Sequence, residues 1–169
     1  MRDYTKDGYR INKMIAMQME LDKAIYNAKD VKYDQEKIKL AILEEIGEMT
    51  HELKGNWCWW KDTQPPVDNQ RVLEELVDVW HFTMNREYHE KFTMVRSYFK
   101  DSDFPLEYIN EDGKGTLEEL NYAIDEFIHE MDIERLVTLT ILLGYTIEDV
   151  YEEYKKKNAE NYERLRNGY

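Results

Sequence analysis

Two acidic pairs are the residues of this sequence best suited to chemistry. In EEIGEM, Glu45 and Glu48 lie three positions apart, and in ELVDVWHF, Glu75 and Asp78 repeat that spacing. At ~100° per residue, positions three apart lie on one side of a helix. Glu45 points in the same direction as the apolar residues of its segment, and Glu48 lies at the edge of that sector. Apolar residues flank the second pair on both sides, so neither pair has the pattern of an ordinary solvated face.

A divalent cation explains acidic residues in such places. Burying unpaired carboxylates is costly, and several together repel one another. Four carboxylates from two facing helices form the oxygen-rich cluster that Mg²⁺ prefers, with Mn²⁺ as a substitute. Magnesium also binds phosphate oxygens, so the cluster predicts phosphate chemistry. A single Glu-x-x-Glu is more often a solvated stripe, but two pairs that interrupt apolar faces favour the metal site.

A basic stripe near the C-terminus could hold the remaining phosphate oxygens. Lys157, Asn161 and Arg164 are spaced by four and three residues, which places them on one helical face. The alternative is a basic helix end that complements the helix dipole, and the stripe alone favours that interpretation.

The elements that carry these residues are predicted to be helices, because the long segments are rich in Glu, Lys, Leu, Met and Ile. The predicted helices run from Tyr9 to Ala28, Asp34 to Leu53, Gln70 with a continuation through Val95 to Phe99, Thr116 to His129, Ile133 to Leu143 and Thr146 to Arg166. Gly55 is expected to stop the second helix, and Gly144 to follow the fifth in a left-handed conformation. The ranges 56–69 and 101–115 are predicted as connections. The chain is therefore expected to be one all-α domain over 1–169.

Composition limits the class of protein and its partners. The formal net charge of −13 argues against binding to nucleic acid or to an anionic membrane, but not against a small phosphorylated substrate that is bridged by cations. The single cysteine, Cys58, excludes an intramolecular disulfide framework and fits a reducing cytosol. No apolar run approaches the ~20 residues that span a bilayer. We therefore expect a soluble, cytoplasmic protein.

Together these motifs resemble a known family. EEIGEM, the tryptophan-rich loop NWCWWK, ELVDVWHF and KNAENYERLRNGY are similar to motifs of the dimeric all-α dUTPases. They are also similar to the phage dCTPases within the larger MazG-like group of nucleotide pyrophosphatases. The resemblance extends from Gln18 to the terminal Asn-Gly-Tyr. It implies a MazG-like helical bundle, a homodimer, and a metal site between two carboxylate-bearing helices.

The resemblance also implies roles for individual residues. Glu45, Glu48, Glu75 and Asp78 match the metal-binding acids, and the counterpart of Glu48 orients the attacking water. The basic stripe matches the phosphate-binding residues, which reverses the interpretation based on the helix dipole. The residues expected near the base or sugar are Gln18, Trp57, Trp60, His81, Phe82 and Asn85. Which of Trp57, Trp59 and Trp60 contacts the base remains open.

The activity implied by the resemblance is Mg²⁺-dependent hydrolysis of dUTP to dUMP and pyrophosphate, which limits uracil incorporation into DNA. Hydrolysis of dCTP, or of several pyrimidine deoxynucleoside triphosphates, is the alternative within the same chemistry. From other classes, an acidic helical interaction protein that mimics DNA and a structural bundle with incidental acidic residues also remain open.

Overall fold

The computed structural model describes residues 4–90 and 113–168, with side chains from Lys6 onward. All the regular elements in these ranges are helices, so the predicted all-α class is confirmed. The helices are α1 (Tyr4–Lys29), α2 (Gln35–Glu52), α3 (Lys54–Trp57), α4 (Asn69–Glu90), α5 (Leu117–Glu130), α6 (Ile133–Leu142) and α7 (Ile147–Arg166). Within the described ranges, no helix combines the length and hydropathy needed to cross a bilayer.

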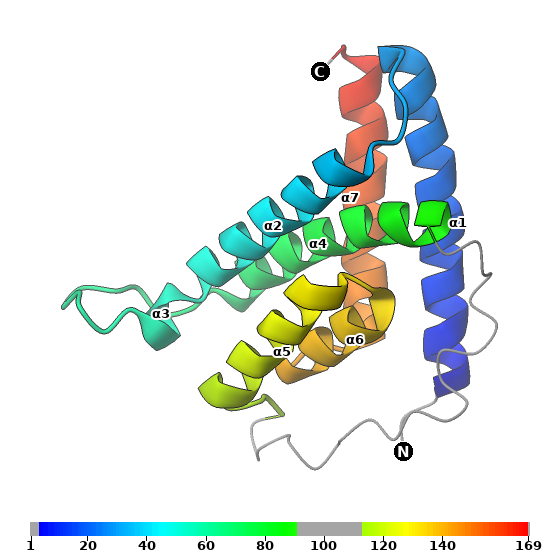
Figure 1. Cartoon of the computed structure of the whole chain (residues 1–169). Coiled ribbons are helices and arrows are strands. Elements are labelled where there is room, and N and C mark those ends of the chain that lie inside the picture. The colour runs from blue at the N-terminus through cyan, green and yellow to red at the C-terminus, as the bar shows by residue number, and fades with distance from the viewer. Residues whose placement is uncertain (1–3, 91–112, 169) are drawn as a thin grey trace.

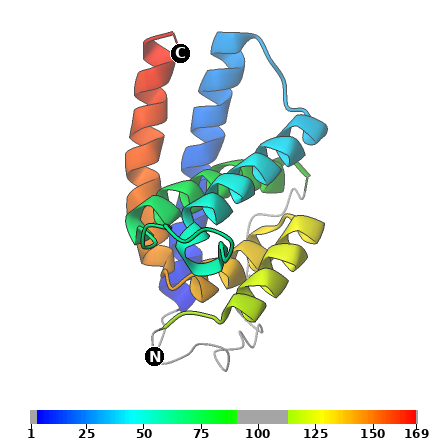
Figure 2. The same ribbon diagram turned by 90° about the vertical axis from the view of Figure 1, so that its left-hand side faces the viewer.

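Two helix pairs and a smaller hairpin make up the arrangement (Figure 1). Helix α2 packs along α4, and α1 packs along α7; the same neighbours are seen after a quarter turn (Figure 2). Helices α5 and α6 pair with each other, and α6 reaches α4. Helix α4 contacts α1, α2, α6 and α7, so it is the central element. Its side chains can therefore meet residues from several helices.

The core explains why α4 takes this central position. Leu76, Val77, Trp80 and Met84 of α4 are fully buried, and the Trp80 indole donates a hydrogen bond to the Thr140 hydroxyl of α6 at 3.1 Å. Burial on all sides of one helix is what the apolar flanks of Glu75 and Asp78 predicted.

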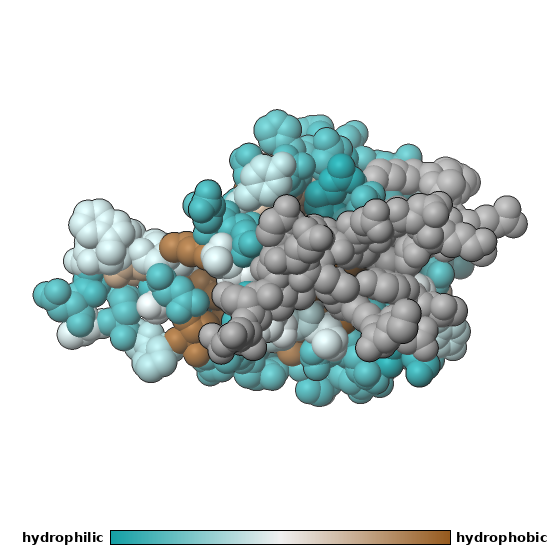
Figure 3. All heavy atoms as spheres, turned by 90° about the horizontal axis from the view of Figure 1, so that it is seen from below, coloured by the Kyte–Doolittle hydropathy of each residue, from teal (hydrophilic) through white to brown (hydrophobic). Residues whose placement is uncertain are grey.

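Seen from below, hydrophilic side chains cover most of the described surface, and a small hydrophobic patch lies beside the protruding segment around α3 (Figure 3).

Most of the predicted helix ends are confirmed by their caps. Asp34 caps α2, and Thr116 and Thr146 form capping boxes with Glu119 and Asp149 at the starts of α5 and α7. Gly144 has φ +90°, the left-handed conformation predicted after α6.

Some helix boundaries differ from the prediction. Helix α1 begins at Tyr4 rather than Tyr9, and α6 ends one residue early, with Leu143 as its C-cap. The described part of α4 ends at Glu90, so the continuation to Phe99 and most of the connection 101–115 lie outside the described residues.

Gly55 does not stop the second helix as predicted, because α2 already ends at Glu52. It lies inside the short helix α3, and its φ is not positive. A Cβ atom at this position would lie 2.8 Å from the carbonyl oxygen of Pro65. The glycine is needed for the close approach of the Pro65-Pro66 segment, which a single sequence does not reveal.

Candidate active site

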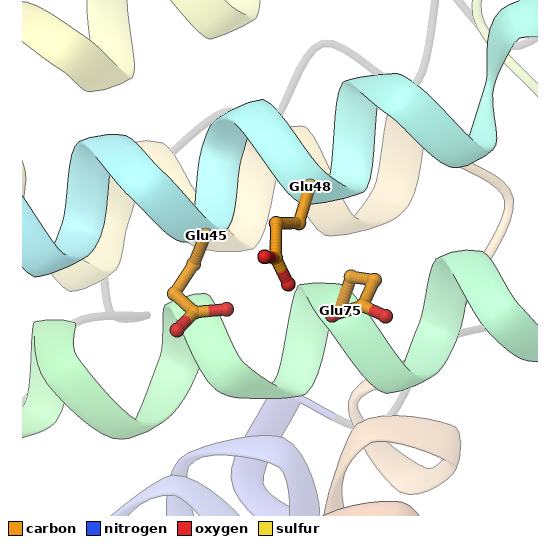
Figure 4. A group of neighbouring side chains, drawn as sticks. All are labelled: Glu45, Glu48 and Glu75. Carbon is orange, nitrogen blue, oxygen red and sulfur yellow. The ribbon is translucent and has the colours of Figure 1, made fainter.

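Helices α2 and α4 bring three of the predicted metal ligands together. One carboxylate oxygen from each of Glu45, Glu48 and Glu75 lies within 4.8 Å of the others. Glu45 and Glu48 extend from α2 towards α4, where Glu75 faces them (Figure 4). Burial of Ile42, and of the apolar residues one and two turns further along α2, fixes the rotation of that helix, which leaves its glutamates at the border of the core. The predicted site between two carboxylate-bearing helices thus has a geometric basis.

The fourth predicted ligand, Asp78, lies beside this group but has a partner of its own. Lys157 of α7 donates a hydrogen bond to Asp78 Oδ2 at 2.5 Å, and both side chains are about one-fifth exposed. The ion pair connects the basic stripe of α7 to the acidic stripe of α4. Sequence spacing placed both residues on helical faces but did not predict their contact.

Three of the acidic residues, Glu45, Glu75 and Asp78, have pKa values shifted towards the protonated form. Burial, and then the charges of Asp78, Glu48, Glu75 and Glu44, raise the pKa of Glu45 to about 7. Burial and the charge of Asp78 also raise the pKa of Glu75, against the opposing effect of Lys157. Burial raises the pKa of Asp78, although the hydrogen bond and charge of Lys157 act against it. A bound cation would relieve both the burial and the repulsion.

Arg71 is a cation at the edge of the cluster that the sequence analysis missed. Its guanidinium lies 3.6 Å from Glu75, 3.7 Å from Glu52 and 3.4 Å from Glu74. The signal was present in the sequence, because Arg71 precedes Glu75 by four residues on one helix. Arg71 partly neutralises the cluster at its exposed end.

The three residues of the predicted phosphate stripe of α7 differ in burial and in their contacts with the acidic residues. Lys157 is half-buried and reaches Asp78. Arg164 is exposed and donates a hydrogen bond to Glu160 of its own helix at 2.9 Å, while its charge opposes the rise in the pKa of Asp78. Asn161, which lies between these two residues in the sequence, is half-buried. The structure therefore brings Lys157 into the site and leaves Arg164 at the surface.

Three of the predicted base or sugar residues lie close together in the interior. Gln18, His81 and Asn85 are all buried, and His81 Nδ1 lies 2.7 Å from Gln18 Oε1. Phe82, the residue after His81 on α4, is half-buried. Tyr154 of α7 donates a hydrogen bond to Gln18 Oε1 at 2.9 Å, a contact absent from the sequence-based site.

The tryptophan loop holds one fixed indole and two exposed ones. Trp57 is half-buried, and its indole N–H donates to the carbonyl oxygen of Thr50 at 2.9 Å. Trp59 and Trp60 are 88% and 56% exposed. The Trp57 and Trp60 rings lie 5.6 Å apart, so Trp60 packs on the fixed indole. A planar ligand at the loop would meet Trp59 or Trp60 more readily than Trp57.

Comparison with known proteins agrees with this site. A family model described as dUTPase matches residues 10–169, which include every predicted site residue. A search of curated proteins found no match. The family is typically metal-dependent, and the glutamate cluster supplies oxygen ligands for a cation. The chain therefore belongs to the all-α dUTPase family and is a hydrolase of the nucleotide pyrophosphatase class, with a dUTP pyrophosphatase-type activity on a nucleotide substrate.

Proposed function

We propose that this protein hydrolyses dUTP to dUMP and pyrophosphate in a Mg²⁺-dependent reaction. The observation that carries the proposal is the three-glutamate cluster between α2 and α4 in a chain of the dUTPase family. Removal of dUTP would limit the incorporation of uracil into DNA. The proposed enzyme is a homodimer in which residues 1–169 of each subunit form one domain.

The cluster suits Mg²⁺ in its donor atoms and its charge. Glu45, Glu48 and Glu75 offer only carboxylate oxygens, which hard divalent cations prefer, and Asp78 is the proposed fourth ligand. When bound, Mg²⁺ would offset the negative charge of the triphosphate, which a protein of net charge −13 otherwise repels.

Glu48 is the proposed general base. Its carboxylate belongs to the cluster, yet the residue is exposed, so water can reach it. In the proposed step, a water oxygen attacks phosphorus and its proton passes to Glu48, while the bond between the α- and β-phosphates breaks and its electrons leave with pyrophosphate. Lys157, Asn161 and Arg164 would hold the phosphate oxygens during this step.

The base is proposed to lie towards Gln18, His81 and Asn85, with Phe82 beside the sugar and Trp57 and Trp60 at the closing loop. His81 and Asn85 follow Asp78 by one and two further turns on α4. Phosphate and base contacts would thus share one helix, which aligns the substrate along α4.

The test is an assay of dUTP and dCTP separately, each with Mg²⁺ and with EDTA, followed by product identification. Release of dUMP and pyrophosphate only with metal, and slower turnover of dCTP, is the expected result. Preference for dCTP would change the assigned base but retain the chemistry. Absence of hydrolysis with either nucleotide would overturn the proposal.

A matched pair of variants tests the general base. Glu48→Gln should lower kcat by roughly 10²–10⁴-fold, the usual contribution of a positioned base. Glu44→Gln is the control, because Glu44 is exposed on the same helix and lies outside the cluster. Equal losses in the two variants would remove Glu48 from this role.

A further inference from the structure

A buried polar network lies where α1, α4 and α7 meet. Gln18 and Asp22 come from α1, His81 and Tyr88 from α4, and Tyr154 from α7. Gln18, Asp22 and His81 are each at most 5% exposed. Asp22 and Tyr88 were not among the site residues predicted from the sequence, and neither has a part in the hydrolysis proposed above.

Hydrogen bonds fix the orientation of the Gln18 amide. Its Oε1 accepts from His81 Nδ1 at 2.7 Å and from the Tyr154 hydroxyl at 2.9 Å. Its Nε2 donates to Asp22 Oδ1 at 2.8 Å. A flipped amide would place its oxygen against the Asp22 carboxylate, which accepts hydrogen bonds but has none to donate when ionised. Asp22 therefore excludes the flipped orientation.

Asp22 is itself held in place by hydrogen-bond donors at both of its carboxyl oxygens. The Tyr88 hydroxyl donates to Asp22 Oδ2 at 2.8 Å, while Gln18 donates to the other oxygen. Burial raises the pKa of Asp22, and the hydrogen bonds from Tyr88, Gln18 and Asn85 oppose that shift by favouring the carboxylate.

The fixed amide also determines which nitrogen of His81 carries hydrogen. An amide oxygen can only accept, so the proton of the Gln18–His81 hydrogen bond is on Nδ1. Burial and the charge of Lys157 lower the pKa of His81 to about 3, so the ring is neutral and Nε2 is an acceptor. Among the described residues, His81 Nε2 and Asn85 Oδ1 are buried without a hydrogen-bond partner. Asp22 occupies one hydrogen of Gln18 Nε2, which leaves the second to donate.

The donor on Gln18 Nε2 and the acceptors His81 Nε2 and Asn85 Oδ1 match the edge of uracil better than that of cytosine. Uracil offers an acceptor at O4 and a donor at N3, whereas cytosine offers a donor at the 4-amino group and an acceptor at N3. Gln18 Nε2 can donate to O4, and His81 Nε2 can accept from N3–H. Cytosine would place donor against donor and acceptor against acceptor, which is costly in a buried site.

We propose that Asp22 is a positioning residue that selects uracil over cytosine by holding the donor side of the Gln18 amide towards the base. The inference rests on the proposed function in one respect, namely that the base reaches Gln18. Asp22 acts through Gln18 and has no contact with the reacting phosphates in this scheme.

The variant Asp22→Asn tests this role, because its amide can donate to Gln18 Oε1 and so permits the flip. The ratio of kcat/KM for dUTP to that for dCTP should fall by about tenfold or more, since sites built around hydrogen bonds discriminate strongly. The change should appear mainly in KM, because the phosphate chemistry is untouched. In a Gln18→Leu background, Asp22→Asn should leave the ratio unchanged.

Asp132→Asn is the matched control. Asp132 is also 5% exposed, but it caps α6 and pairs with Arg135, away from the network. Asparagine caps helices as well as aspartate does, so this variant should fold and keep the wild-type ratio. Circular dichroism melting of every variant checks the fold. A purely structural Asp22 would lower stability without a change in the ratio, and that result would overturn the inference.

Binding of dUMP and dCMP, measured by calorimetry, separates this inference from the proposed hydrolysis. Tighter binding of dUMP that Asp22→Asn abolishes would support the inference even if the wild-type protein hydrolysed neither triphosphate. Hydrolysis of dUTP with an unchanged ratio in Asp22→Asn would retain the proposed function and overturn the inference. Failure of both hydrolysis and binding would overturn both.

Discussion

The ionised form of Glu45 is destabilised by its surroundings in the acidic cluster. Its pKa of about 7 arises first from burial and then from neighbouring carboxylates. In the unfolded chain the same carboxyl titrates near the ordinary value of 4.5. Between these two values the unfolded state releases its proton first, so stability of the metal-free protein falls as the pH rises from about 4.5 to about 7.

Glu45→Gln should remove part of this loss of stability at rising pH. In EDTA, the melting temperature of the wild type should fall between pH 5 and pH 7.5 by roughly 2–4 °C more than that of the variant, a modest value because solvent screens a half-buried carboxyl. Added Mg²⁺ should raise the melting temperature of the wild type and have less effect on the variant. Parallel pH curves for the two proteins would show that Glu45 titrates normally.

Lys157 differs from its sequence neighbour Lys156 in its contact with the site. Lys157 pairs with Asp78 of α4, whereas Lys156 pairs with Glu153 of its own helix and is 70% exposed. Lys157→Met should reduce kcat/KM for dUTP by roughly 10- to 100-fold, because a hydrogen bond to a charged group contributes ~1.5–3 kcal/mol. Lys156→Met should change the activity less than about twofold, as expected for a surface pair. Similar steady-state kinetics for the two variants would exclude Lys157 from phosphate binding.

At the scale of the elements, α3 is the segment that the sequence did not predict. Gly55 allows the Pro65 carbonyl to pass where a Cβ atom would lie 2.8 Å from it. Gly47, in contrast, is an exposed glycine within α2 with nothing within 4 Å of such an atom. A larger side chain would therefore clash at Gly55 but would fit at Gly47.

Gly55→Ala should lower the free energy of unfolding by ~1–3 kcal/mol, because backbone must move to accept the methyl group. Gly47→Ala should raise it by ~0.5–1 kcal/mol through the better helix propensity of alanine. Urea denaturation measures both changes. A stable Gly55→Ala variant with unchanged tryptophan emission would mean that the loop has room for the methyl group.

The sequence predicted within-helix features well and contacts between helices poorly. The helix starts at Thr116 and Thr146 and the buried stripe of α4 depend on spacing along one chain segment, and the structure confirms them. The Lys157–Asp78 pair and the Asp22 network depend on how α7 and α1 pack against α4. Side-chain periodicity gives a residue its helical face but not the residue that faces it from another helix.

At the scale of the whole molecule, the proposed homodimer has a simple test. Several apolar side chains remain exposed on the single chain, among them Leu40 at 67% and Leu43 at 40% on α2. Sedimentation equilibrium at micromolar concentration should give twice the mass of the 20.5 kDa chain. The mass of a monomer at that concentration would contradict the dimer but not the hydrolysis.

The tryptophan loop gives the molecule an optical property. Of the four tryptophans, Trp80 is fully buried and Trp57 is half-buried, whereas Trp59 and Trp60 face the solvent. An aqueous quencher such as iodide would therefore reach the fluorescence of two indoles and leave that of the core. Because the exposed pair lies on the segment expected to close over the base, nucleotide arrival would be visible as a loss of quenching and a blue shift of the emission. The intrinsic tryptophan fluorescence would thus measure nucleotide binding without an added label.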